Sequence, residues 1–260
     1  MLASKSILPI FLFLSFLFYS MSMGCGNIFE DMADDSTKEA QLEEAQMALD
    51  KGDYTTAVNM LLSLCGLSAA DPTSGTPTCD NATISLLASA YMGRAGLDLI
   101  KIIDTAAQDT TIGQQGIFTE FSSLLINGNE QDMENAVKLL KNIQGKTPEQ
   151  NLQMAVAATA DTVLIVRDAV GGFNSSGLPN SVPSSFNTTT TNTVTDNISL
   201  ISTGISGSGI ANADLTSDIS TLQTNIAGGD TSANSCDLRK YLCSVNPTAT
   251  GCPVPITDCP

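Results

Sequence analysis

The feature that most constrains the fold is a strongly apolar helix pattern near the middle of the chain. Thr147, Pro148 and Gln150 form a helix start, because threonine and glutamine at this spacing make a capping box and proline suits the first turn. The run MAVAATADTVLIV that follows is apolar on nearly every side, and a helix of that kind is buried. We therefore predict a central buried helix over residues 148–170, with other helices packed around it.

The rest of the chain also has the apolar periodicity of helices. It predicts helices over 37–51, 54–64, 82–105, 117–126 and 132–143, and a weaker one over 213–227. The Gly-rich stretch 204–209 indicates a break between helices. Residues 171–196 are rich in Ser, Thr and Asn and indicate a linker or long loop. We expect an all-α fold.

A repeated motif accompanies the first helices. The segment AQMALDKGDYTTAVNMLLSL resembles a tetratricopeptide repeat, with Ala45, Gly52, Tyr54, Ala57 and Leu61 at that family's small and bulky positions. The later run LLASAYMGRAGLDLIKII resembles it again, without the Gly-Asp turn. The resemblance implies a short solenoid of about three helical pairs over 38–170. An irregular helical bundle is the alternative.

The amino terminus has the layout of a secretory signal. Lys5 precedes an apolar run over 7–19, and small residues follow, ending at Gly24 and Cys25. A cysteine in this position resembles that of a bacterial lipoprotein signal. The resemblance implies that the leader is removed and that Cys25 carries a lipid anchor. Ordinary secretion, with Cys25 as a plain thiol, is the alternative.

The same resemblance bears on location. Ser22 and Met23 depart from the residues that the lipoprotein family usually has before the cysteine, whereas Gly26 differs from the Asp that retains such proteins at the inner membrane. The resemblance implies the bacterial cell envelope, at the outer membrane facing the periplasm. The predicted organisation is a leader over 1–24, an acidic tether over 25–36, a helical domain over 37–170, a linker over 171–196, and weak helices with a Cys-rich tail over 197–260.

The cysteine count fits an exported, lipidated chain. There are seven cysteines: Cys25, Cys65, Cys79, Cys236, Cys243, Cys252 and Cys259. Lipidation of Cys25 leaves six, enough for three disulfides in an oxidising compartment. Cys65 and Cys79 flank a Pro/Gly/Ser/Thr-rich loop, which favours a local bridge. The four tail cysteines are expected to pair among themselves and staple a tail that has no core of its own. Their wide spacing disfavours a zinc site.

The composition excludes several function classes. The chain has no histidine and a formal net charge of −16. The missing imidazole excludes Ser-His-Asp and Cys-His catalysis, and the acidic charge disfavours nucleic-acid binding. No phosphate-binding or dinucleotide-binding glycine motif is present, and the acidic tether lacks the spacing of a calcium loop. We predict no catalytic residue, no metal and no cofactor.

Charged side chains within apolar helices are the remaining site candidates. If a binding groove exists, we expect it near Tyr91, Arg94, Asp98, Asp161 and Arg167. The structural alternative pairs Arg94 with Asp98, four residues later on one helix face, and leaves Asp161 facing a groove or solvent. Substitution of Arg94 and Asp161 without effect on partner binding would contradict the groove hypothesis.

These observations favour a non-catalytic scaffold. The expected protein is lipid-anchored in the cell envelope and binds a protein or peptide partner there, with the membrane contacted through the lipid. This function rests on an analogy of fold, which does not fix function. The alternatives are a structural or surface envelope lipoprotein without a defined ligand, and an enzyme that uses carboxylates alone.

Overall fold

The computed structural model describes residues 37–97, 121–209 and 231–252. The chain divides into two compact units, 1–40 and 41–260. In the first unit, Thr37 Oγ1 accepts a hydrogen bond from the Ala40 amide (3.1 Å) at the start of a helix.

The described residues confirm the predicted all-α fold. They contain no β-strand, only two isolated bridges, Phe173–Pro179 and Ser181–Thr250. None of the described helices has the length and apolar composition needed to cross a bilayer. The fold of the second unit is therefore built by helices packing on helices.

The first two described helices end and begin where local chemistry dictates. Helix α2 (Lys38–Asp50) is followed by Gly52 at φ 75°, a conformation that favours glycine. Helix α3 (Tyr54–Cys65) is capped by Asp53, whose carboxylate accepts from the Thr56 amide (3.2 Å). Both helices were predicted within one residue at each end.

Helix α4 (Asn81–Arg94) is shorter than the predicted helix over 82–105. Ala95 closes it, and Gly96 follows at φ 94°, outside the helical region. The Ala95 carbonyl then accepts from the Asn129 amide (3.0 Å), so a residue distant in sequence takes part in the helix end. The prediction was wrong at residues 95–97, because apolar periodicity continues through a glycine at which the backbone turns; the predicted residues 98–105 lie outside the described ranges.

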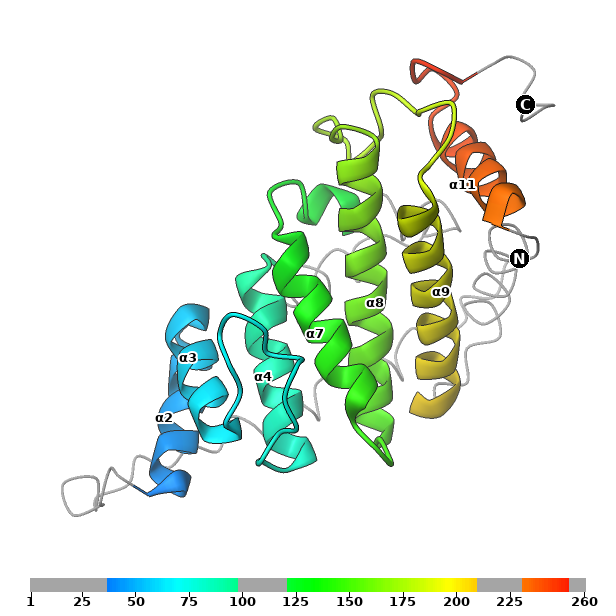
Figure 1. Ribbon diagram of the computed structural model, residues 1–260. Helices are drawn as coiled ribbons and strands as arrows, with labels where there is room; N and C mark the ends of the chain where they lie inside the picture. The colour runs from blue at the N-terminus through cyan, green and yellow to red at the C-terminus, as the bar shows by residue number, and fades with distance from the viewer. Residues whose placement is uncertain (1–36, 98–120, 210–230, 253–260) are drawn as a thin grey trace, which may run out of the picture. The chain divides into compact units, whose positions relative to one another are not determined.

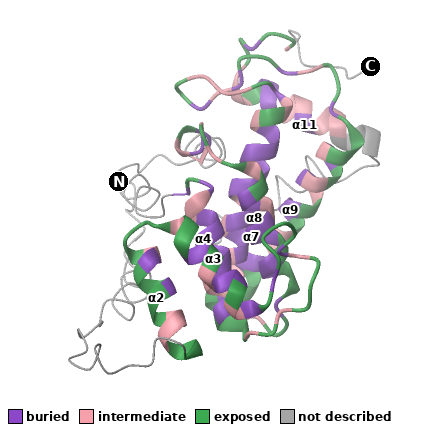
Figure 2. Cartoon of the chain, turned by 60° about the vertical axis from the view of Figure 1, so that its left-hand side comes forward, coloured by how far each residue is buried: buried purple, intermediate pink, exposed green. Residues whose placement is uncertain are grey.

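Residues 121–124 are helical, and the part of the predicted 117–126 helix before them lies outside the described residues. Helix α7 (Glu130–Asn142) and helix α8 (Pro148–Ala169) then form a helical hairpin, and the expected capping box of Thr147 with Gln150 is present. Buried residues run along α8 from Gln150 to Val166, which confirms the predicted central buried helix (Figure 2).

Helix α9 (Thr188–Ser208) corrects two predictions. Its first turns lie in the predicted linker over 171–196, and its last turns include the predicted break over 204–209. Asn187 caps it, with its side chain accepting from the Thr190 amide (2.8 Å). Its buried face recurs at helical spacing, with Val194, Ile198, Ile201 and Ile205 all turned inward. The many Ser and Thr residues between these apolar positions made the segment look like a linker by composition.

Consecutive helices of the second unit contact one another in chain order. Helix α3 contacts α4, α4 contacts α7, α7 contacts α8, α8 contacts α9, and α9 contacts helix α11 (Thr231–Val245). Figure 1 shows α4, α7, α8 and α9 side by side in that order. The contact between α8 and α9 is the most extensive of these.

The tail has a core of its own, contrary to expectation. A second apolar cluster joins the ends of α8 and α9 to α11 and the segments around it. Its buried members are Ile165, Val166, Val170, Val182, Phe186, Val194, Ile198, Leu238, Leu242, Cys243 and Ala249. We call these residues the C-terminal core; the larger cluster, from Ala45 to Leu164 with Ile201 and Ile205, is the main core. The predicted helix over 213–227 lies outside the described residues.

Candidate functional site

Arg94 forms a partly buried ion pair across two helices. Its Nε and Nη2 donate to the two carboxylate oxygens of Asp132 at 2.8 and 2.6 Å, and its guanidinium carbon lies 4.9 Å from the ring centre of Tyr91. The hydrogen bond to Asp132 raises the pKa of Arg94 above its usual range, and burial raises that of Tyr91. This arrangement joins the last turn of α4 to the first turn of α7.

The expected pairing of Arg94 with Asp98 needs correction. That pairing required one helix to continue through both residues, but α4 ends at Arg94. Asp98 itself lies outside the described residues. The missed partner, Asp132, stands in the first turn of α7, where an acidic side chain is favoured by the helix dipole, but only packing brings α7 beside Arg94.

Arg167 supports the chain before α7. Its Nη1 donates to the carbonyl oxygens of Leu125, Ile126 and Gly128 at 3.1, 3.3 and 2.8 Å, and its Nε donates to Asp168 at 2.7 Å. A helix end leaves carbonyl groups without helical partners, and a guanidinium can satisfy several at once. The described contacts of Arg167 are thus with its own chain.

Asp161 lies inside the protein, not on a groove or in solvent. It is 1% exposed, and its Oδ2 accepts a hydrogen bond from Asn197 Nδ2 of α9 (2.7 Å). Its Oδ1 is buried without a hydrogen-bond partner among the described residues. Burial raises the pKa of Asp161 from its ordinary value of 3.8 to about 6, although the bond from Asn197 opposes this.

A second carboxyl pair was not predicted. Glu130, in the first turn of α7, lies beside Asp168, in the last turn of α8. Burial and the hydrogen bond with Asp168 raise the pKa of Glu130 to about 7. Burial alone would raise the pKa of Asp168, but its hydrogen bonds with Arg167 and Glu130 lower it. The short connection between α7 and α8 could have indicated this pair. In an antiparallel helical hairpin, the start of the first helix lies beside the end of the second.

The structure therefore separates the predicted groove residues. Arg94, with Tyr91 beside it, pairs with Asp132, whereas Arg167 donates to Asp168, which is also hydrogen-bonded to Glu130. Residues two apart on a helix point to nearly opposite sides, so Glu130 and Asp132 hold these two sets on different faces of α7.

The raised pKa of Glu130, about 7, allows this carboxyl group to hold a proton near neutral pH. Glu130 and Asp168 form a carboxyl pair in which Glu130 retains its proton more strongly. Across the described ranges, no group of three or more His, Cys, Asp or Glu side chains is placed to hold a metal ion.

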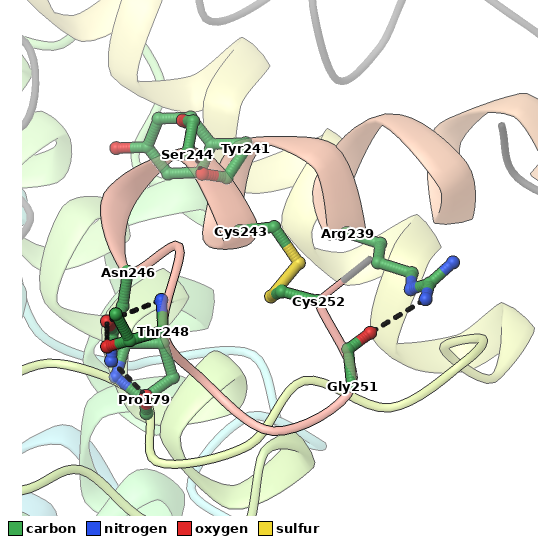
Figure 3. Close-up of a disulfide and its surroundings, with 9 residues drawn as sticks. All are labelled: Pro179, Arg239, Tyr241, Cys243, Ser244, Asn246, Thr248, Gly251 and Cys252. Atoms are coloured by element: carbon green, nitrogen blue, oxygen red, sulfur yellow. Dashed lines mark hydrogen bonds between the residues drawn. A yellow bond between two sulfur atoms is a disulfide. The ribbon is translucent and has the colours of Figure 1, made fainter. Parts of the chain in front are cut away.

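Two disulfides lie within the described residues, and the first is the local bridge that the sequence favoured. Cys65 is bonded to Cys79, and Cys243 to Cys252. Figure 3 shows the second bridge beside the Arg239 to Gly251 carbonyl hydrogen bond (2.8 Å). Cys236 is also disulfide-bonded, and its partner lies outside the described residues. Cys25 and Cys259 lie outside them too.

Comparisons of the chain with protein-family models, with curated proteins and with solved structures found no match.

Proposed function

We propose that this chain is an exported, lipid-anchored protein of the bacterial cell envelope that serves as a non-catalytic scaffold for a protein or peptide partner. The observation that carries export is the pairing of Cys65 with Cys79 and of Cys243 with Cys252. Disulfides form and persist in oxidising compartments and are rare in the cytosol. They agree with the signal-like leader before Cys25.

The lipid anchor is supported by the number of cysteines left after disulfide pairing. All five cysteines within the described residues are disulfide-bonded. A third bridge from Cys236 to Cys259 would use every cysteine except Cys25. A lipid on Cys25 then explains why an exported chain has an odd number of cysteines.

The scaffold assignment rests on the order of the helices and on how charge is used. Serial contact between consecutive helices is the arrangement of repeat proteins, which present extended binding surfaces. Arg94, Asp132 and Arg167 bond to other parts of the chain, an arrangement that stabilises structure. The net charge of −16 favours a partner with a neutral or basic surface.

Intact mass spectrometry of the protein purified from its own membranes tests export and anchoring. We expect a chain that begins at Cys25, carries lipid, and gains about six hydrogens on reduction, one pair for each of three disulfides. The matched control is Cys25→Ser, which should release a lipid-free chain from the membrane fraction. A lipid-free wild-type chain that begins elsewhere would refute the anchor.

Site-specific photo-cross-linking in intact cells tests the scaffold. Met47, the large hydrophobic residue left exposed on α2, is one probe position, and Ser199, exposed on α9, is a second. A scaffold should give the same discrete cross-linked partner in repeated experiments, and cross-linking should weaken in the Cys25→Ser background. Position-independent cross-linking to many abundant proteins, or none at probes spread over the exposed helix faces, would refute it.

A further inference from the structure

A buried polar contact, between Asp161 and Asn197, lies where the two apolar cores meet. Helices α8 and α9 run antiparallel, since Asp161 contacts Asn197 while Ala155 lies against Gly204. Along α8, the main core ends at Leu164 and the C-terminal core begins at the next residue. The Asp161–Asn197 contact stands at this boundary.

The contact satisfies Asp161 only in part. One carboxylate oxygen accepts from Asn197, and the other is buried with no partner in the described part of the chain. An ionised carboxylate removed from water needs several hydrogen bonds to offset its lost hydration. A protonated carboxyl carries no net charge and needs far less compensation, so the geometry favours the neutral form.

The charges that face Asp161 strengthen this preference. From α7, Glu134 acts on Asp161 as a like charge and Lys138 acts as an opposite charge. Glu130, also on α7, responds to the charge of Asp161, which helps to raise the pKa of Glu130 to about 7. Lys138 is exposed and already forms an ion pair with Glu134 (2.8 Å). From α9, the facing group is the neutral amide of Asn197.

We propose that the Asp161–Asn197 contact is a pH-sensitive clasp, at which α9, with α11 packed on it, loosens from α8 when Asp161 loses its proton. Loosening gives the carboxylate access to water, which the closed contact denies it. The proposal does not depend on the protein's being a scaffold.

The loosening should be local because each core has separate support. The C-terminal core is tied by the Cys243–Cys252 bridge and by the hydrogen bond from the Val182 amide to the Thr250 carbonyl (2.8 Å). The main core is tied at its far end by the Cys65–Cys79 bridge. Neither support crosses the boundary at Asp161.

Amide hydrogen exchange of the full mature chain at pH 5 and pH 8 tests the clasp, with rates corrected for the intrinsic effect of pH. If the pKa of Asp161 is about 6 closed and 3.8 open, the local opening constant should rise about tenfold between these pH values. The rise should appear in α9 and α11 and be absent from α4. No rise, or an equal rise in all three helices, would overturn the proposal.

Three variants separate the clasp from a merely structural contact. Asp161→Asn should abolish the pH dependence of opening, whereas Asp196→Asn, an exposed charge on α9 beside the contact, should leave it intact. Asn197→Ala should move the dependence to higher pH, because the carboxylate loses its donor. Carboxyl-carbon NMR of the wild-type chain reads the Asp161 titration directly, so the proposal stays testable if a variant fails to fold. A midpoint near 4 would refute it.

Discussion

Gly204 of α9 offers the sharpest test of the α8–α9 contact. A Cβ built on Gly204 would lie 2.5 Å from the Asn151 carbonyl oxygen and 3.0 Å from both the amide nitrogen and Cβ of Ala155. Two of these three atoms are backbone, so Gly204→Ala cannot be accommodated by turning a side chain. The two helices must move apart.

The magnitude follows from two opposing effects. Replacing a helical glycine by alanine gains about 1 kcal/mol of helix propensity. Overpacking a tight interface costs about 1–3 kcal/mol, and backbone contact places Gly204→Ala at the upper end of that range. We therefore expect a net loss of about 1–2 kcal/mol in the free energy of unfolding.

Gly207→Ala, three residues later, is the matched control. Its Cβ would meet the Asn151 side chain, at 2.7 Å from Cγ and Nδ2, and that side chain can rotate away. Asn151 would then give up an exposed 3.3 Å hydrogen bond to the Gly207 carbonyl. We expect a change between zero and about 1 kcal/mol in favour of the variant.

Urea unfolding with the disulfides intact measures both variants. The midpoint should fall for Gly204→Ala and hold or rise for Gly207→Ala, with unchanged slopes, because the surface exposed on unfolding is the same. If Gly204→Ala is as stable as the wild-type chain, the close approach of α8 and α9 is refuted.

Three further changes have defined outcomes. Arg94→Ala should cost about 2–3 kcal/mol in urea unfolding, because it leaves the buried Asp132 carboxylate unpaired; equal stability would refute the ion pair's role. Folding raises the pKa of Asp161, so its contribution to the free energy of unfolding is full below about pH 4 and lost above about pH 6. The wild-type chain should therefore lose about 3 kcal/mol between pH 3 and pH 8 that Asp161→Asn does not lose, as urea unfolding at the two pH values would show. Replacing Cys65 and Cys79 together by alanine should cost about 3 kcal/mol by thermal unfolding, since their 14-residue separation closes a loop in the unfolded chain; no loss would contradict that account.

Local chemistry in the sequence was enough to locate several helices. Thr147, Pro148 and Gln150 predicted the start of α8, and the apolar run after them predicted its burial. Asp53 lies where the Gly-Asp turn predicted a new helix, and the short Cys65–Cys79 loop predicted its own bridge. These features succeed because each depends on residues close together in the chain.

The same reasoning failed where distant segments decide the structure. The Gly-rich stretch 204–209 was predicted to be a break because glycine weakens a helix, yet Gly204 permits α9 to approach Asn151 and Ala155 of α8. Arg94 was matched with a neighbour in sequence, and its partner is Asp132 on another helix.

The sequence by itself determined the helical class, most helix starts and the local Cys65–Cys79 bridge, because capping, periodicity and short loops are local. Only the tertiary structure decided that α9 is a helix through its glycines, that the tail has a core, and that Asp161 is buried against Asn197. The physical reason is that burial and ion pairing depend on which surfaces meet, and no single segment carries that information.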